Sequence, residues 1–537
     1  MFQTLDLTAE IRDLCTHLTA DRVAVAAPSA YETGRLVTLA PWLAGHERRI
    51  GFLLDGQRPD GSWGGADGYA VVPTLSAVEA LMTVLERGDV AGGHHDPAHE
   101  RAVRAAIERG LRAAAGLLAD VAATGPPPTA GAAMVIAALT EAVNDRAGGR
   151  RPLRAPGGGA EQLARLRGGA WRVPLLSHYL ELAGPEVARA AEIRPVEGAV
   201  CGSAAATVAW LGPGPAGPSD DPSDDPAAGA AVRMLTELQA RFGGPVPAFT
   251  SQVFVARAWS LAHLALAGVD RALLSGPRDA LAAALGTGAG GLPGGPGLPA
   301  DSDTTAVALF ALARLGVSRP LDHLWEYDTG THFVTVRPET EASTSVNAHI
   351  LMALGDHAAR GGPASARCAA AVPRIAAWLA ARQRGDGGWL DKWHASPFYA
   401  TRSCALALHR YGGPGAAAPV DRAVRWVLGE QRADGSWGRW GPTVEETAYA
   451  VQTLIHVGGR TPAGRRAVAR GCRFLLRHRG HAVRDHPPLF HGKDLVTIPD
   501  LVRAAALAAL ESARRRPDLA AVQDADDLDD LDDVDDG

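Results

Sequence analysis

Two aspartates stand close together at the start of an apolar segment, directly after a run rich in glycine and proline. The run covers residues 286–299, and the segment Asp301-Ser-Asp303-Thr-Thr305 follows it. Aspartate and serine are common at helix starts, where they cap backbone N–H groups and interact favourably with the helix dipole. A carboxyl group held at such a position can also act as an acid or a base. The triplet Asp301-Ser302-Asp303 alone does not decide between a capping role and a catalytic role.

Two lysines, Lys392 and Lys493, are the only ones among 53 basic residues. The chain is rich in Ala, Gly, Arg and Pro, which suggests that arginine replaces lysine wherever either residue serves. An ammonium group is compact and strongly hydrated, whereas a guanidinium group is flat and rigid. The two lysines are therefore candidates for sites that need an ammonium group, and chance survival on the surface is the alternative.

A seven-residue pattern occurs three times, each time after an apolar segment with helical spacing. The copies are Gln57–Trp63, Gln383–Trp389 and Gln431–Trp437, with Gln, Arg, Asp, Gly and Trp at identical offsets. An Asp-Gly pair favours a tight turn, and the Gln amide can satisfy free backbone groups at a helix end while the Trp ring covers them. The last two copies lie 48 residues apart, about one helical hairpin, which favours a ring of stacked hairpins.

The elements that must position these residues are helices. Ala/Leu/Val segments at helical spacing alternate with Gly/Pro punctuation, and period-two alternation is scarce, so the sequence predicts an all-α fold. Residues 306–314 are apolar nearly all round, which favours burial in an inner layer of helices. The Pro/Gly/Ser/Asp-rich stretch 212–229 is expected to be a flexible insertion, and the acidic stretch 517–537 a disordered tail.

Charge and cysteine content argue against several functional classes. The net charge is -6, ten aspartates follow Pro517, and the rest of the chain is near +4 without a basic run, which argues against nucleic acid as a partner. The five cysteines are scattered without metal-ligand spacing, so we expect reduced thiols. No apolar run reaches the roughly 18 residues that a bilayer requires, and no targeting signal is evident, so we expect a cytoplasmic protein without a transmembrane segment.

The repeats and the aspartate triplet together resemble the QW and DxDD motifs of class II terpene cyclases. The resemblance implies two α/α barrels, the first formed by residues 21–245 and the second, which carries the aspartates, by residues 246–516. It also implies that residues 1–20 form a helix that packs with the second barrel. Protein prenyltransferase β subunits have a related barrel, but the Asp/Cys/His motifs of their zinc site are not found here.

The resemblance gives the aspartates a chemical role. Asp303 matches the acid that protonates the terminal alkene of a polyprenyl chain, and Asp301 would orient it. An alkene is a very weak base, so the acid must be protonated, rigid and enclosed in a dry cavity. Thr304 stands where the family motif has its last aspartate. Asn347 matches an asparagine that hydrogen-bonds the acid in diterpene cyclases, and a polar residue at a helix start is the alternative interpretation.

Further roles follow from matched segments. Lys392 corresponds to a lysine that holds the substrate diphosphate, and Lys493 is a second candidate for that group. His178 aligns with a histidine that, together with an asparagine, holds the deprotonating water in plant copalyl enzymes. The position of that asparagine is Ala248 in this chain, so an intact water-binding dyad is not assumed for His178.

The family also implies an aromatic pocket and a Mg²⁺ cofactor. Carbocations need π faces that stabilise positive charge without offering a nucleophile. Only Asp60 and Asp67 occur where the family's acidic motif is expected, so the metal ligands are left unassigned. The aromatic residues expected to stabilise the cation lie close in sequence to the matched segments: Trp325, Phe333, Tyr399 and Tyr449.

These features predict an enzyme that cyclises a prenyl diphosphate by protonating an alkene and keeps the diphosphate. Length and the DxDTT variant resemble bacterial drimenyl diphosphate synthases, which predicts farnesyl diphosphate as substrate and a bicyclic drimenyl diphosphate as product. A diterpene cyclase that converts geranylgeranyl diphosphate to a copalyl or halimadienyl diphosphate is the alternative, and a squalene-hopene cyclase comes third. A non-catalytic helical scaffold that binds peptides or lipids is the alternative from a different class.

Overall fold

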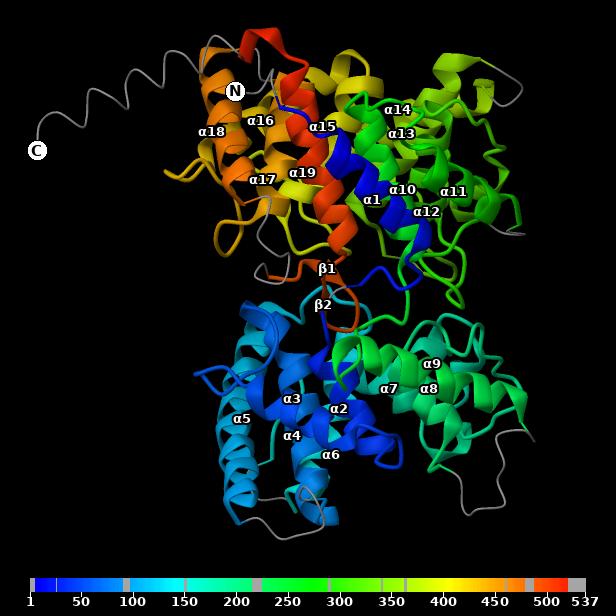
Figure 1. Cartoon of the computed structure of the whole chain (residues 1–537), viewed down its shortest axis with the longest axis vertical. Helices are drawn as coiled ribbons and strands as arrows, with labels where there is room; N and C mark the ends of the chain where they lie inside the picture. The colour runs from blue at the N-terminus through cyan, green and yellow to red at the C-terminus, as the bar shows by residue number, and fades with distance from the viewer. Residues whose placement is uncertain are drawn as a thin grey trace, which may run out of the picture.

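The chain folds into two helical bodies joined at a narrow junction, as predicted for the all-α class (Figure 1). The computed structural model describes residues 5–25, 27–89, 97–148, 152–214, 225–287, 291–339, 341–361, 365–458, 461–478 and 487–519.

The larger body is an α/α barrel with a closed inner ring, in which each helix contacts the next and the last contacts the first. These helices are buried on nearly all sides, as expected for the apolar segments of the sequence. The inner ring consists of α10 (Val253–Leu266), α12 (Ser302–Arg314), α13 (Thr344–Arg360), α15 (Pro397–Tyr411), α17 (Val444–Thr453) and α19 (Pro499–Arg514).

An outer layer covers this ring. The first helix of the chain belongs to it, because its apolar face shares the core of the larger body. The outer helices are α1 (Thr8–Ala20), α11 (Ser275–Thr287), α14 (Ser365–Ala381), α16 (Ala417–Gly429) and α18 (Pro462–His478). Short helical turns connect these layers: η7 (Asp322–Tyr327), η8 (Pro414–Ala416), η9 (Leu454–Gly458) and η11 (Pro517–Leu519).

The smaller body has its own hydrophobic core, which runs from Tyr31 to Val246. Its inner helices are α2 (Ala30–Leu39), α4 (Val71–Arg87), α6 (Ala132–Arg146) and α8 (Ala204–Leu211), and the turn η5 (Leu176–Leu182) lies beside α8. The remaining elements are α3 (His46–Asp55), α5 (Pro97–Thr124), α7 (Gly159–Arg167), α9 (Pro226–Phe242), η2 (Asp67–Ala70), η4 (Ala170–Arg172) and η6 (Pro185–Val187).

The three repeats fasten inner and outer helices in the way the sequence predicts. In the third copy, the Gln431 amide donates to the carbonyl oxygens of Gly435 and Ala467 at 3.0 and 2.9 Å, and the fully buried Trp437 donates to the carbonyl of Val427 at 2.7 Å. The other two copies make the same contacts. Gly435 has a φ of 86°, and a Cβ there would lie 2.7 Å from a backbone oxygen, so the turn requires glycine.

Two sequence expectations about loops need correction. Part of the expected insertion 212–229 is helical, because α9 begins at Pro226 and Asp225 caps its first turn. The acidic tail was expected to begin at residue 517, but residues 517–519 form a helical turn, and Leu519 packs into the core. The rest of the expected insertion and tail lies outside the described residues, at positions 215–224 and 520–537.

Among the described residues, one apolar helical stretch has the length and hydropathy of a membrane span. It runs from Asp67 to Arg87, through η2 and α4, and 83% of its apolar window is buried inside the protein. Because α4 contacts α2, α5 and α6, its apolar surface belongs to the core of the smaller barrel.

A short antiparallel hairpin crosses from the larger barrel to the smaller one. It is formed by β1 (Phe490–His491) and β2 (Leu495–Val496), and its turn carries Lys493. The Nζ of Lys493 lies 2.8 Å from Glu32 Oε1, Glu181 Oε1 and Ser203 Oγ, all in the smaller barrel. Lys493 is 1% exposed. A buried cation with two buried carboxylates therefore holds the barrels together.

We expect Lys493→Met to lower the free energy of unfolding by about 3–5 kcal/mol, because two buried carboxylates would lose their cation. Urea denaturation followed by circular dichroism measures the change. The matched control is Lys392→Met, since this half-buried ion pair lies nearer to solvent and should contribute about 1 kcal/mol or less. Equal losses in the two variants would contradict the special role of Lys493.

Candidate active site

A cavity of about 180 Å³ lies at the junction of the two barrels. One buried water needs only roughly 10–15 Å³, so this cavity has room for a substantial apolar ligand. The smaller barrel contributes Ala130, Leu175, His178 and Tyr179. The larger barrel, the junction segment and the hairpin contribute most of the other lining residues, among them Phe249, Trp259, Asp301, Asp303, Trp393, Tyr399, Phe490 and His491.

Asp303 presents a carboxyl group to this cavity. It lies in the first turn of α12 and is 7% exposed. Its Oδ1 is 2.6 Å from Nδ1 of His349, on the neighbouring helix α13. The imidazole therefore holds one carboxyl oxygen, and Oδ2 has no partner among the residues that the structure describes. Such a group is rigid and keeps one oxygen free for a bound molecule.

Asp301 caps the same helix. Its Oδ1 accepts from the backbone N–H of Thr304 at 2.6 Å, and its Oδ2 accepts from the hydroxyl of Thr304 at 2.9 Å. Burial raises the pKa of Asp301 to about 7 against these hydrogen bonds. Thr304, which replaces the last aspartate of the motif, thus donates to Asp301. Asp301 both caps α12 and lines the cavity.

The expected hydrogen bond between Asn347 and Asp303 is not formed. Asn347 instead accepts from the backbone N–H of Phe333 at 2.9 Å, and its amide donates to the carbonyls of Phe333 and Ser343. His349 occupies the position beside the acid. Two residues correspond to about 200° around a helix, so the side chains at 347 and 349 cannot both face Asp303.

His178 faces the cavity from the smaller barrel. Its Nδ1 lies 2.8 Å from the carbonyl oxygen of Cys201, so Nδ1 carries the proton and Nε2 has the free lone pair. Burial, aided by the positive charge of Lys493, lowers the pKa of His178 to about 3. The ring stacks on Phe249 with 5.6 Å between centroids. His178 is therefore a neutral imidazole at ordinary pH.

The two lysines have different surroundings. Lys392 pairs with Glu339 and lies 3.8 Å from Glu341, next to the cavity-lining Trp393. Lys493 was expected to be a second diphosphate-binding residue, and the structure does not support this expectation. Its Nζ is fully buried between two carboxylates and a hydroxyl, so a diphosphate cannot reach it without breaking the junction.

Only one of the four predicted aromatic residues lines the cavity. Tyr399 does, and its hydroxyl accepts from Nε1 of Trp259 at 2.9 Å. Tyr449 lies behind Tyr399, with 5.5 Å between the ring centroids. Trp325 and Phe333 pack against each other away from the cavity lining. Five further aromatic residues line the cavity and were not predicted, although two of them are the sequence neighbours of His178 and Lys392: Tyr179, Phe249, Trp259, Trp393 and Phe490.

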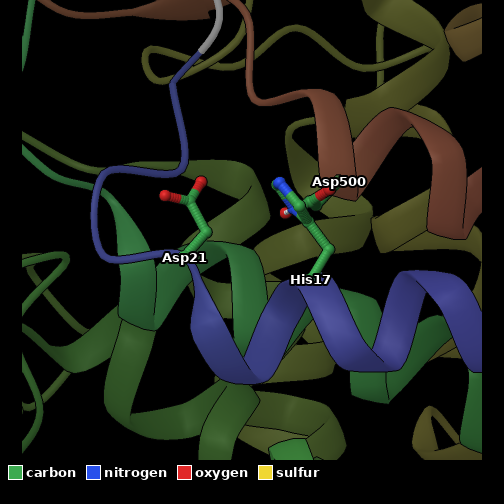
Figure 2. Close-up of side chains that lie close together, drawn as sticks. All are labelled: His17, Asp21 and Asp500. Atoms are coloured by element: carbon green, nitrogen blue, oxygen red, sulfur yellow. Dashed lines mark hydrogen bonds and ion pairs between the residues drawn. The ribbon is translucent and has the colours of Figure 1, made fainter. Parts of the chain in front are cut away.

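A group of possible metal ligands lies on α1 and α19, outside the cavity lining (Figure 2). His17 Nδ1 is 2.8 Å from Asp500 Oδ2. Asp21 is already satisfied, because Arg241 donates to both its oxygens and two backbone N–H groups donate as well. These contacts tie α1 to α19 and to the smaller barrel.

Comparisons with known proteins agree with this architecture. A family model described as the squalene-hopene cyclase C-terminal domain matches residues 336–486. The ent-copalyl diphosphate synthase of Streptomyces sp. (strain KO-3988) is 42% identical over 95% of this chain and 96% of its own length. The copalyl diphosphate synthase of Streptomyces cyslabdanicus is 36% identical over 94% of this chain and 96% of its own length.

A solved structure extends the similarity to the arrangement of the barrels. The ent-copalyl diphosphate synthase from Streptomyces platensis is 41% identical and superposes with a TM-score of 0.82. The match covers 94% of this chain and 99% of that one, so it includes both barrels and the junction between them.

We expect His178 to stay neutral down to about pH 4, because its pKa is about 3. Nitrogen-15 NMR of histidine-labelled protein measures this, with the signal assigned by its loss in His178→Gln. A His178 signal that titrates between pH 6 and 7 would contradict the geometry.

Proposed function

The chain belongs to the bacterial class II terpene cyclases, and from this premise we propose that it converts geranylgeranyl diphosphate into a copalyl-type diphosphate. The similarity to copalyl diphosphate synthases supports an enzyme that cyclises a prenyl diphosphate, so the scaffold alternative is set aside. Proteins named as copalyl diphosphate synthases match 94–95% of this chain. Their similarity favours the diterpene alternative over the expected farnesyl substrate and drimenyl product.

The observation that carries this proposal is the Asp303 carboxyl group, which is held by His349 and faces a cavity with aromatic walls. Asp303 transfers its proton to the terminal alkene, whose electron pair forms the new C–H bond. The next double bonds attack the resulting cation in turn and close two rings. A proton then leaves a carbon next to the last cation, a double bond forms, and the diphosphate stays attached. One proton enters and one leaves, so the reaction is an isomerisation.

Two further residues fit steps of this reaction. Burial raises the pKa of Asp301 to about 7, which favours its neutral form and so limits its repulsion of the carboxylate left on Asp303. His178 is neutral, and its Nε2 lone pair faces the cavity from the opposite barrel. We assign to His178 the role of terminal base, without the asparagine partner of the plant enzymes, since Ala248 stands at that position.

The diphosphate is assigned to Lys392 together with Mg²⁺. Two carboxylates, Glu339 and Glu341, surround the Lys392 ammonium. Mg²⁺ prefers oxygen ligands and usually takes one or two protein carboxylates in addition to substrate phosphates, so these residues fit the ion. Bound there, the ion would neutralise charge on the diphosphate. Lys392 would exchange its pair with Glu339 for a diphosphate oxygen.

The chain-length proposal predicts that kcat/KM is at least tenfold higher for geranylgeranyl diphosphate than for farnesyl diphosphate. A C15 chain cannot reach from the diphosphate site to Asp303 if the cavity is built for one more isoprene unit. The measurement is incubation with each substrate, phosphatase treatment and mass spectrometry of the alcohols. A tenfold preference for the C15 substrate would instead restore the drimenyl interpretation.

We expect Lys392→Ala to raise KM tenfold or more while the melting temperature changes by only a few degrees, because the variant removes a ligand contact at the edge of the cavity. Arg384→Ala is the control, since its guanidinium pairs with Asp386 on an exposed loop. EDTA should inhibit the native enzyme, and added Mg²⁺ should restore activity. Full activity in EDTA, or an unchanged KM in the variant, would contradict the assignment.

A further inference from the structure

The wall of the cavity at Tyr399 is backed by a second aromatic ring. His394, at 1% exposure, lies nearly parallel to Tyr399, with 4.2 Å between centroids and 14° between planes. Tyr399 in turn lines the cavity next to the acid, and its ring centroid is 6.2 Å from that of His349. A charge change on His394 would therefore act on the cavity through a single aromatic layer.

Hydrogen bonds fix the protonation state of His394. The backbone N–H of Ser396 donates to Nδ1 at 3.0 Å, so Nδ1 carries the lone pair. Nε2 must then carry the proton, and it lies 3.0 Å from Oε1 of Glu445. His394 is a neutral imidazole that donates to a carboxylate, because a second ring proton would break the bond to Ser396.

Glu445 is buried without a compensating cation. It is 3% exposed, and the hydroxyl of Tyr449 also donates to its Oε1 at 3.0 Å. Two donors on one oxygen stabilise a negative charge on this carboxylate. Among the described residues, no lysine or arginine forms an ion pair with Glu445, and its neutral partner His394 does not cancel the charge. Burying a carboxylate without a cationic partner lowers the stability of the fold, so a contribution to stability does not explain why Glu445 is buried.

We propose that Glu445 and His394 are positioning residues for catalysis that direct negative charge, through Tyr399, at the positive charge developing in the cavity. Oriented charges in a site from which water is excluded stabilise a transition state strongly, because they need no reorganisation during the reaction. The carboxylate lies behind the aromatic wall, so it cannot trap the cation covalently. This inference rests on the proposed cyclisation.

The test compares two ligands of similar shape by calorimetry on the full-length enzyme. One is an aza analogue of geranylgeranyl diphosphate whose terminal unit carries a protonated tertiary amine, and the other is the uncharged dihydro analogue. We expect Glu445→Gln to weaken binding of the ammonium ligand at least tenfold more than binding of the neutral ligand. Glu445→Asp keeps the charge and should preserve the preference for the ammonium ligand.

The matched control is Glu446→Gln. Glu446 is the next residue and is also buried, but it accepts from the backbone of Arg439 and from Thr443 instead of from His394. Its variant should leave the preference unchanged. Should Glu445→Gln fail to fold, His394→Gln breaks the same link from the other end, and the same selective loss is expected.

Four results separate the possibilities. Equal weakening of both ligands in Glu445→Gln, or no weakening, would overturn the inference by showing a structural role or none. The same selective loss in Glu446→Gln would also overturn it. Failure of the native enzyme to bind either ligand would instead contradict the proposed function.

Discussion

The buried ammonium of Lys493 is the interaction on which the site depends. The cavity has walls from both barrels, so its shape exists only while the barrels keep one relative position. Lys493 fixes that position by contacting Glu32, Glu181 and Ser203 from the tip of the hairpin. The same hairpin carries Phe490 and His491 into the cavity, and Glu181 follows His178 on η5. One ion cluster therefore couples the stability of the junction to the position of the proposed base.

The electrostatics of the cavity follow from burial. On one side Asp301 caps α12, where hydrogen bonds favour its carboxylate form, while burial raises its pKa to about 7. On the side of the smaller barrel, burial and the charge of Lys493 keep His178 neutral and ready to accept a proton. Burial therefore sets the chemical state of both Asp301 and His178.

The sequence predicts the fold better than it predicts the site. The all-α class and the contacts of the three repeats follow from local spacing, since a Gln, a Gly and a Trp at fixed offsets can satisfy only one kind of helix end. The rotation of α13 about its axis is set by the packing of the larger barrel and cannot be predicted from local sequence. For this reason Asn347 was expected beside the acid, where the structure places His349. Likewise, Trp325 and Phe333 are near the motifs in sequence, but their loop folds away from the cavity. Lys493 was expected to bind the diphosphate, but its ammonium group instead binds the carboxylates at the junction of the barrels.

Incorporation of deuterium tests the central claim, that Asp303 delivers a proton to an alkene of a prenyl diphosphate, most directly. The native enzyme and Asp303→Asn are each incubated with geranylgeranyl diphosphate in deuterium oxide, and the products are examined by mass spectrometry. The account predicts one deuterium in a cyclised product that keeps its diphosphate, and no cyclised product from the variant although it still binds substrate. A product without deuterium, release of inorganic diphosphate, or normal turnover by Asp303→Asn would contradict it.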